Sequence, residues 1–331
     1  MTVPVVAFFN NIGGVGKTTF VYHIAWMLNE LGRSVAVLDL DPQANLTASF
    51  VDERRIEELW FGAPRRTVYG AVAPLFEGSG DLADPHVEEI ESGLGLVPGD
   101  VLLSGAEQDL SDAWASSLSG DVRAFQMTTA FSIVAQRAAA QMDAEIVLMD
   151  AGPNLGAINR AASVASDHVV LPLRPDLYSL QGLRNLGPTL RRWRRDWTDR
   201  AAGAPCSDLY LSSGRMRARG YAVLRHGLRV DRAVGPYDRW LRQIPTEYRS
   251  SVLDEPVDEA PIVAEDEYCL GLIKYYYSLA SLAQEARKPI FLLSSAEGAI
   301  GSYQPAVQDA YGHFESLTRR LLSVLDLEVP A

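Results

Sequence analysis

Cysteine, histidine and lysine are all scarce in this chain of 331 residues, which holds two, five and three of them. The two cysteines, Cys206 and Cys269, lack the CxxC spacing of redox and zinc sites, and the few histidines are scattered along the chain. These shortages argue against a disulfide framework, a zinc centre and a histidine-based metal cluster.

Long hydrophobic runs are also absent. No stretch approaches the roughly 18 apolar residues that a membrane-spanning helix needs, and the apolar start at 1–10 has no basic leader or cleavage site. The amphipathic stretch at 311–327 has too few cations for a helix that lies on a membrane. We therefore expect a cytoplasmic protein that has no membrane partner.

Apolar runs and helical stretches alternate along the chain, and 47% hydrophobic residues suffice for a substantial core. The runs predict strands at 3–9, 35–40, 93–97, 145–149 and 168–173, with weaker candidates at 221–224 and 289–293. This order predicts an α/β fold, a doubly wound and mainly parallel sheet with helices on both faces. No linker is evident, so we expect one domain over 1–331, with a less regular helical and loop segment at 51–92 along one edge.

The clearest motif is GGVGKTT at residues 13–19, directly after the first predicted strand. Phosphate oxygens must approach backbone N–H groups closely, which glycine permits because it has no Cβ. The segment then opens a helix, whose N-terminal N–H groups and dipole attract an anion. Lys17 adds a positive charge for the β- and γ-phosphates, and Thr18 offers a hydroxyl to Mg²⁺. The motif therefore predicts a site for a nucleoside triphosphate with Mg²⁺.

Carboxylates follow two further predicted strands. Asp39 and Asp41 lie at the end of the second strand, and Asp150 follows the run at 145–149. The carboxyl ends of parallel strands meet at one crevice, so these side chains should lie beside the phosphate loop. One member of the Asp39/Asp41 pair can serve the metal while the other orients a water for attack on the γ-phosphate, and Asp150 can reach Mg²⁺ through water.

On these motifs the chain resembles the ParA/MinD family of P-loop ATPases, the group with a deviant Walker A motif. The similar blocks, closer to the ParA branch than to the MinD branch, are NNIGGVGKTT at 10–19, LDLDPQAN at 38–45, DAGPNLG at 150–156, and the segments 170–183 and 285–290. The resemblance covers most of the chain and implies the P-loop NTPase fold, with ATP and Mg²⁺ as cofactors.

The resemblance also implies roles for single residues. Lys17 would be the phosphate lysine, and Thr18 and Asp150 would serve the metal. Asp41 would position the hydrolytic water, with Asp39 in support. The expected nucleotide contacts are Asn11, Gly13, Gly14, Val15, Gly16, Lys17, Thr18 and Thr19.

The chain departs from this family at one position. The family usually carries a second lysine just before the two glycines, which crosses a dimer to the partner's phosphates, and here that position is Ile12. An arginine could replace it, and the candidates lie within 177–195, such as Arg184. Because such a cation can be worth ~10³-fold in rate, we expect hydrolysis that is slow or that a partner stimulates.

Arginines gather in one part of this acidic protein. Residues 171–250 hold 16 Arg, no Lys and 7 Asp+Glu, a net charge of +9, against −21 for the remainder and −12 in total. Arginines together with Trp193 could grip phosphates and stack on a base. The candidate nucleic-acid contacts, in a part of the chain where the resembled family binds DNA without sequence preference, are Arg191, Arg192, Arg194, Arg195, Arg215, Arg217 and Arg219. Alternatively, Trp193 and Trp197 face the core or a partner while the arginines are solvated.

Three functions are compatible with these features. In the first, a ParA-like switch, ATP drives homodimerisation or partner binding and hydrolysis resets it, for the partitioning or positioning of DNA or a protein assembly. In the second, a nucleotide-sensing regulatory subunit of a plasmid-borne or defence-type system hydrolyses little ATP, which Ile12 favours. The third, an ATP-dependent metabolic enzyme, is the weakest because no substrate-pocket motif is evident. The resembled family usually works beside a partner encoded nearby, and we expect one here.

Overall fold

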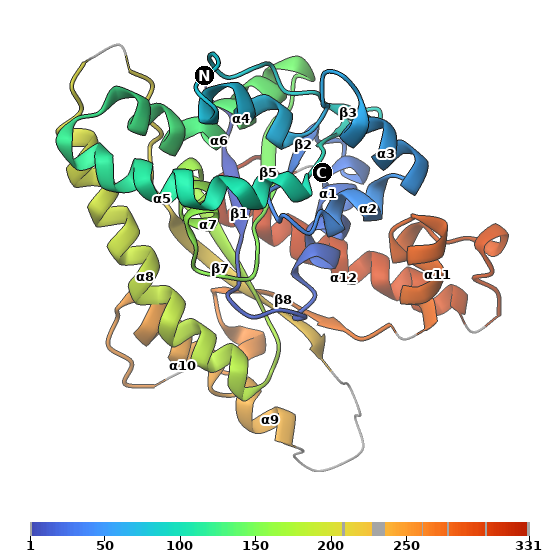
Figure 1. Ribbon diagram of the computed structural model, residues 1–331. Coiled ribbons are helices and arrows are strands. Elements are labelled where there is room, and N and C mark those ends of the chain that lie inside the picture. The colour runs from blue at the N-terminus through green and yellow to red at the C-terminus, as the bar shows by residue number, and fades with distance from the viewer. Residues whose placement is uncertain are drawn as a thin grey trace.

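The computed structural model describes residues 2–206, 209–226, 236–259, 261–276, 278–301 and 303–329. Its centre is one eight-stranded sheet with the strand order β3-β4-β2-β5-β1-β6-β7-β8 (Figure 1). All neighbouring strands are parallel except β3 and β4. The strands are β1 (Val5–Phe8), β2 (Val35–Asp39), β3 (Glu88–Glu91), β4 (Leu94–Val97), β5 (Ile146–Asp150), β6 (His168–Leu173), β7 (Arg217–His226) and β8 (Cys269–Lys274).

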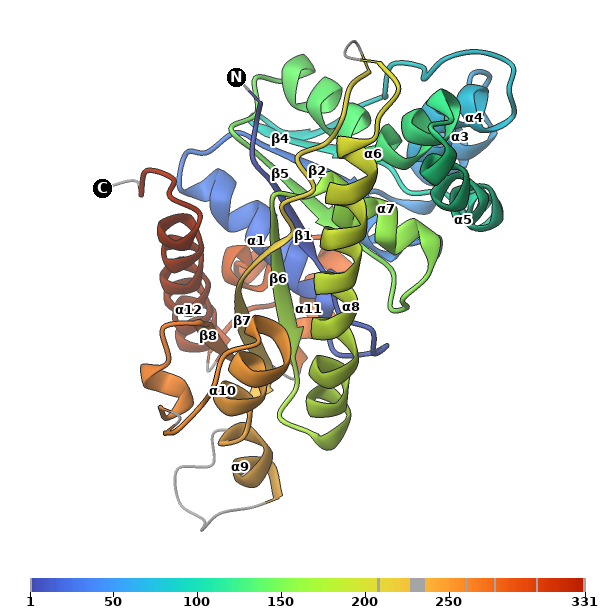
Figure 2. The ribbon, with the colours of Figure 1, turned by 90° about the vertical axis from the view of Figure 1, so that its left-hand side faces the viewer.

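Helices cover both faces of the sheet, which confirms the predicted doubly wound fold. Figure 2 shows α1 and α12 on one side of the strands and α6, α7 and α8 on the other. The first face carries α1 (Lys17–Glu30), α2 (Asn45–Phe50), α11 (Ser278–Ala286) and α12 (Tyr303–Val324). The second face carries α4 (Val68–Phe76), α5 (Ala106–Ser116), α6 (Val122–Gln141), α7 (Ala157–Ala165) and α8 (Leu177–Ala202). Each face has its own hydrophobic cluster.

The central strands β1, β2 and β5 are buried at every residue. A parallel strand between two helical layers has no solvent face, and this explains their nearly continuous apolar sequences. Asp39 and Asp150 are the exceptions, and each is the last residue of its strand. The polar groups of these strands are therefore concentrated at the carboxyl edge of the sheet.

The sequence prediction differs from the structure in three places. Residues 289–293 form the 3₁₀ turn Ile290–Leu292 and not a strand, since Pro289 has no N–H for a sheet ladder. The segment 51–92 contains α3 (Glu53–Phe61), α4 and the unpredicted edge strand β3. The strand β8 was also not predicted, and its Gly271 allows close packing of α12, because a Cβ there would lie 2.7 Å from Leu317 Cδ1.

The last part of the second face is a short helical hairpin packed on α8. It comprises α9 (Pro236–Leu241), α10 (Ile244–Glu247) and the helical turn Tyr248–Leu253. A Cβ on Gly187 of α8 would lie 2.0 Å from the carbonyl oxygen of Ser251, so only glycine permits this approach. Within the described ranges, no helix combines the length and the apolar character needed to cross a membrane.

Candidate functional site

The phosphate-loop residues 11–16 connect the end of β1 to the start of α1. Gly14 and Gly16 have φ angles of 76° and 98°, which residues with a Cβ avoid. A Cβ on Gly13 or Gly14 would meet no described atom within 4 Å, so the space over the loop is open. Because Gly16 offers no side chain to cap α1, the first N–H groups of this helix remain available to an anion.

Lys17 and Asp150 form an ion pair at the carboxyl edge of the sheet, where the sequence predicts the ligand crevice. Lys17 Nζ contacts Oδ1 of Asp150, and the Asp150 side chain is fully buried. The second carboxylate oxygen, Oδ2, accepts a hydrogen bond from the Thr18 hydroxyl at 2.7 Å. The structure thus brings the predicted phosphate lysine together with both predicted metal-site residues.

Asp39 and Asp150 end neighbouring strands and are register partners across β2 and β5. Burial, and then the negative charge of Asp150, raises the pKa of Asp39 to about 7. Burial also raises the pKa of Asp150, although Lys17 and Thr18 act against this shift. Asp41 is buried as well, at 5% exposed. Among the described residues, these aspartates do not form a cluster of three or more ligands around one metal position, so Asp150 with the Thr18 hydroxyl is the acidic group placed nearest the phosphate loop.

Thr47 of α2 holds Asp39, a role that the sequence analysis missed. Oδ2 of Asp39 accepts hydrogen bonds from the backbone N–H and the hydroxyl of Thr47, both at 2.8 Å. The same hydroxyl oxygen accepts the Gly99 N–H at 2.7 Å. Asp41 is oriented separately, by the Gln43 N–H at 3.0 Å. Position 47 lies two residues after the block LDLDPQAN, near the start of α2, but no motif marks its hydroxyl as a partner of Asp39.

Asn159 of α7 was also missed, and it fixes the loop that follows Asp150. Its Oδ1 accepts the Gly152 N–H at 2.8 Å. Its Nδ2 donates to the carbonyl oxygens of Gly152 and Asn154 at 2.9 and 2.8 Å. Asn159 is buried, and its hydrogen bonds tie the 150–156 loop to α7.

Ile12 lies against α8. A Cβ on Gly182 would approach Ile12 Cδ1 and Asn11 Oδ1, each at 2.9 Å, so the loop and the helix are in close contact here. Arg184, the arginine suggested above as a replacement for the missing lysine, is turned to α10. Its Nη2 lies 2.7 Å from Oε2 of Glu247, which argues against that assignment.

The two arginine clusters lie in different surroundings. Arg191 donates to the Val252 carbonyl at 3.1 Å and lies 3.3 Å from Asp254 Oδ1, so it holds the helical hairpin on α8. Arg219 donates to His168 Nδ1 at 3.1 Å. The exposed members of the two clusters are Arg192, Arg194, Arg195, Arg215 and Arg217.

A hollow of about 310 Å³ joins the two clusters at the amino end of β7, away from the phosphate loop. Its lining includes Arg191, Arg194, Arg217 and Arg219. Trp193 and Trp197 are 3% and 1% exposed, and Trp193 stacks on Phe9 with ring centroids 6.2 Å apart. The suggestion that Trp193 stacks on a base is therefore wrong, because the face of this ring is covered by the core.

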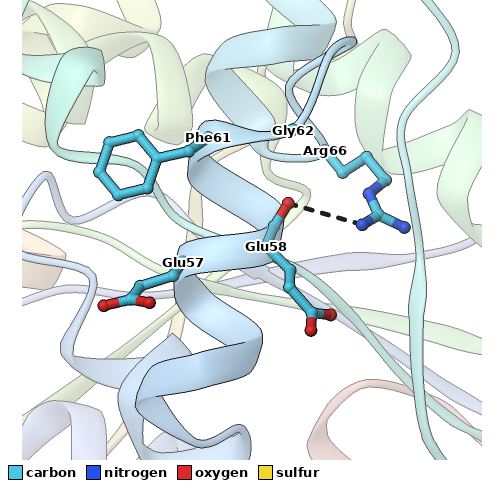
Figure 3. A pocket seen from close by; sticks show the side chains of 5 residues that line it. All are labelled: Glu57, Glu58, Phe61, Gly62 and Arg66. Atoms are coloured by element: carbon cyan, nitrogen blue, oxygen red, sulfur yellow. Dashed lines mark hydrogen bonds between the residues drawn. The ribbon is translucent and has the colours of Figure 1, made fainter.

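A second hollow, of about 510 Å³, lies on α3 (Figure 3). It is lined by Glu57, Glu58, Phe61, Gly62 and Arg66. Arg66 Nη2 donates to the Glu58 carbonyl at 3.5 Å, and the Phe61 side chain is 76% exposed. This hollow contains none of the phosphate-loop or carboxylate residues, so it is separate from the crevice.

The crevice residues fit a triphosphate with a divalent cation. The open loop and the uncapped start of α1 suit phosphate oxygens, and Thr18 with Asp150 supplies hydroxyl and carboxylate oxygens for Mg²⁺. Asn11 Oδ1 is buried, and the described part of the protein provides it with no hydrogen-bond partner. Such an atom at the entrance of the loop is consistent with a ligand site.

Comparison with known proteins agrees with this arrangement. A family model described as an AAA domain matches residues 3–200. The sporulation initiation inhibitor protein Soj of Bacillus subtilis is 29% identical over 187 residues, which cover 56% of this chain and 64% of Soj. The chromosome partitioning protein ParA of Caulobacter vibrioides is 29% identical over 192 residues, which cover 57% of this chain and 63% of ParA. The chain thus spans somewhat less than two thirds of these relatives.

Solved structures agree on the fold. Protein DIP2308 from Corynebacterium diphtheriae has a TM-score of 0.73 and 22% identity, with 98% of this chain and 99% of that chain covered. A plasmid partition protein from Borrelia burgdorferi has a TM-score of 0.58 and 14% identity, with 98% and 99% covered. From the matched domain, the partitioning relatives and the geometry of the crevice, we conclude that the chain belongs to the ParA-like family of P-loop ATPases.

Proposed function

We propose that this protein binds ATP with Mg²⁺ at the phosphate loop and works as a switch in the partitioning or positioning of DNA or of a protein assembly. The ion pair between Lys17 and Asp150 carries the proposal. A bound triphosphate attracts Lys17, and Mg²⁺, which neutralises phosphate charge, attracts Asp150 and Thr18. Ligand binding therefore separates the pair, and Asn159 passes the movement of the 150–156 loop to α7.

Calorimetry tests the binding step. Wild-type protein should release or absorb heat with ATP and Mg²⁺, and Lys17→Ala should lose that heat. Asn185→Ala, which removes an exposed side chain of α8, serves as a control that should bind as the wild type does. Equal heats from the wild type and Lys17→Ala, or no heat from either, would overturn the proposed function.

Hydrolysis is proposed to be slow or stimulated by a partner, because Ile12 places no charge at the start of the phosphate loop. Ile12→Lys should therefore raise steady-state ATP turnover above that of the wild type. Rapid turnover by the wild-type protein alone would contradict this part of the proposal. Stable binding of ATP without turnover would instead favour the second candidate, a nucleotide-sensing regulatory subunit, which the uncharged Ile12 also supports.

A homodimer with ATP and a partner protein encoded nearby belong to the same proposal. Exposed apolar side chains follow β5 and β6 at the carboxyl edge, where Leu155, Leu177 and Tyr178 are 38%, 51% and 71% exposed. Apolar exposure around a ligand crevice supports contact with a second chain. Light scattering should show a larger mass with ATP than with ADP, and Tyr178→Asp should prevent the increase.

Non-specific DNA contact is proposed for the exposed arginines around the 310 Å³ hollow. These guanidinium groups lie on one surface although they come from α8 and β7. Their placement supports phosphate binding, whereas the net charge of −12 opposes long-range attraction to DNA.

A further inference from the structure

The carboxyl end of β6 places an arginine beside the start of the phosphate loop. Strands β1 and β6 pair Val6 with His168 and Phe8 with Val170. Beyond the strand, Asn10 Nδ2 donates to the Pro172 carbonyl at 2.5 Å, with the same sequence separation of 162 residues. Arg174 follows Pro172 by two residues, and its N–H donates to Ser179, three residues before Gly182, where α8 contacts Ile12, so Arg174 lies near the start of the phosphate loop.

The lysines of the chain are already engaged. Lys17 pairs with Asp150, Lys274 with Asp309, and Lys288 with Glu297. Lys274 ends β8 and Lys288 lies in the turn after α11. Neither lysine follows β1, β2 or β5, the strands that lead to the phosphate loop and the site aspartates. No lysine of this chain can therefore take the place that Ile12 leaves uncharged.

In the loops that directly follow β1, β2, β4, β5 and β6, at 9–16, 40–44, 98–100, 151–156 and 174–176, the one arginine is Arg174, and the segment 227–235 after β7 lies outside the described residues. Two arginines further along the helices are engaged elsewhere. Arg160 of α7 lies over Trp114, 4.6 Å from the ring centroid. Arg184 of α8 donates through Nε to Glu247 at 2.9 Å.

The loop of Arg174 is held firmly while its guanidinium group is only weakly engaged. The Arg174 N–H donates to Ser179 Oγ at 3.0 Å, and Asp176 Oδ1 caps α8 by accepting the Ser179 N–H at 2.8 Å. Arg174 Nε lies 3.7 Å from Asp176 Oδ2, beyond hydrogen-bond distance, and the side chain is 35% exposed. A partly exposed ion pair of this kind is weak, so a phosphate can compete for the guanidinium group.

We infer that Arg174 supplies the positive charge that Ile12 lacks, through contact between its guanidinium group and the phosphates of the bound nucleotide. This inference rests on the proposed function, because it needs a triphosphate in the crevice. An arginine suits the role, since it is always charged and its fork matches phosphate oxygens. The nucleotide belongs either to the same chain or to a facing copy, and the experiment separates these sources.

The experiment compares Arg174→Ala, Arg174→Lys and the double variant Ile12→Lys with Arg174→Ala, by ATP and ADP affinity and by kcat and KM. Arg174→Ala should weaken ATP binding or lower kcat by about 10-fold or more, with a smaller effect on ADP. The double variant should recover part of the loss, since a lysine returns positive charge to this place. Arg174→Lys should lie between the wild type and Arg174→Ala.

Arg242→Ala is the matched control, because Arg242 also forms an ion pair with a nearby aspartate, Asp238, at 2.8 Å. It should stay within about twofold of the wild type. Thermal unfolding of each variant checks that the fold persists. If Arg174→Ala binds and hydrolyses ATP as the wild type does while Lys17→Ala loses binding, the inference is wrong and the proposed function stands. A loss caused by Arg184→Ala in place of Arg174→Ala would also overturn it.

Mixing Arg174→Ala with Lys17→Ala identifies the source of the nucleotide. The first variant has an intact phosphate loop, and the second has an intact arginine. Activity recovered in the mixture means that Arg174 reaches the nucleotide of a facing copy. Arg174→Ala defective both alone and in the mixture means that Arg174 serves its own chain. If the wild-type protein binds no ATP, both the proposed function and this inference are wrong.

Discussion

The ammonium group of Lys17, at the start of α1, is ion-paired with the buried carboxylate of Asp150, at the end of β5. One strand and one helix that carry separate motifs are thereby joined before any ligand arrives. Each residue is also the group that a triphosphate or Mg²⁺ would attract. Under the function proposed above, a nucleotide that occupies the crevice would open the pair, and this opening would start the switch.

Removal of one partner from this pair should destabilise the protein. Lys17→Met leaves Asp150 buried without a counter-charge, and we expect a loss of about 3 kcal/mol in the free energy of unfolding. Asp150→Asn added to Lys17→Met should recover much of this loss, because the amide carries no charge. Denaturant unfolding without nucleotide measures both changes. If the double variant is less stable than Lys17→Met, the unpaired charge of Asp150 is not the cause of the stability lost in Lys17→Met.

Lowering the pH should reduce the free energy of unfolding, because the buried side chain of His23 is neutral in the folded protein. Its Nδ1–H donates to the Thr19 carbonyl at 2.6 Å, and its Nε2 accepts the Ile290 N–H at 3.1 Å, so the ring is neutral. Burial lowers the pKa of His23 to about 4. Because the folded-state pKa lies below the unfolded value of ~6.5, this stability is complete above pH ~6.5 and falls as the pH drops toward 4. The expected loss at pH 5 is about 2 kcal/mol.

The free energy of unfolding at pH 7 and pH 5 measures this effect. His23→Gln should be less stable than the wild type at pH 7 but should lose less stability between the two pH values. His168, whose pKa is also lowered to about 4, keeps its contribution in both proteins and so cancels in the comparison. An equal loss in His23→Gln and in the wild type would contradict the assignment.

Gly182 should control the shape of the phosphate loop from α8. A Cβ there would lie 2.9 Å from both Asn11 Oδ1 and Ile12 Cδ1, so a larger side chain must displace the loop. We expect Gly182→Val to weaken ATP binding by about 10-fold or more. Gly312→Val in α12 has no described atom within 4 Å of the new Cβ, and it should leave affinity unchanged. Calorimetry measures the ATP affinity of the two variants. Equal affinities would show that Gly182 does not control the shape of the phosphate loop.

The arginines of the two clusters should behave differently in DNA binding. Arg194→Ala and Arg217→Ala remove exposed guanidinium groups at the hollow, and each should weaken binding and reduce the salt slope by about one. Arg191→Ala should instead lower thermal stability, because this residue holds the helical hairpin. Fluorescence anisotropy with duplex DNA from 50 to 200 mM salt measures the slopes. A wild-type affinity that does not depend on salt would exclude phosphate contact by these residues.

The sheet and the crevice were largely predictable because their signals are local. The strands β1, β2 and β5 are short runs of buried apolar residues, and such runs, when turn residues bound them, are typical of buried parallel strands. The strand β8 was harder to predict, because Gly271 interrupts its apolar run and the tyrosines that follow it are compatible with a helix as well as with a strand. Residues 289–293 misled the prediction because apolar content alone does not show that Pro289 prevents a ladder.

Site residues held by distant contacts were not predictable in the same way. Thr47 and Asn159 act through hydrogen bonds to Asp39 and to the 150–156 loop, and neither belongs to a motif whose chemistry requires it. The arginine chosen from the sequence, Arg184, faces Glu247. Helical spacing alone could not show this, because Glu247 comes from a hairpin 63 residues later.

The sequence by itself determined the phosphate loop, the acidic strand ends and the family, because each depends on residue types at fixed spacing along one short segment. Only the tertiary structure decided which arginines are exposed, that Arg184 turns to Glu247, and that Lys17 meets Asp150. Lys17 and Asp150 are 133 positions apart, and Asn10 and Pro172 are 162 positions apart. Chain folding, and not spacing, sets such distances, since the register of the strands and the close contacts at glycine bring these groups together.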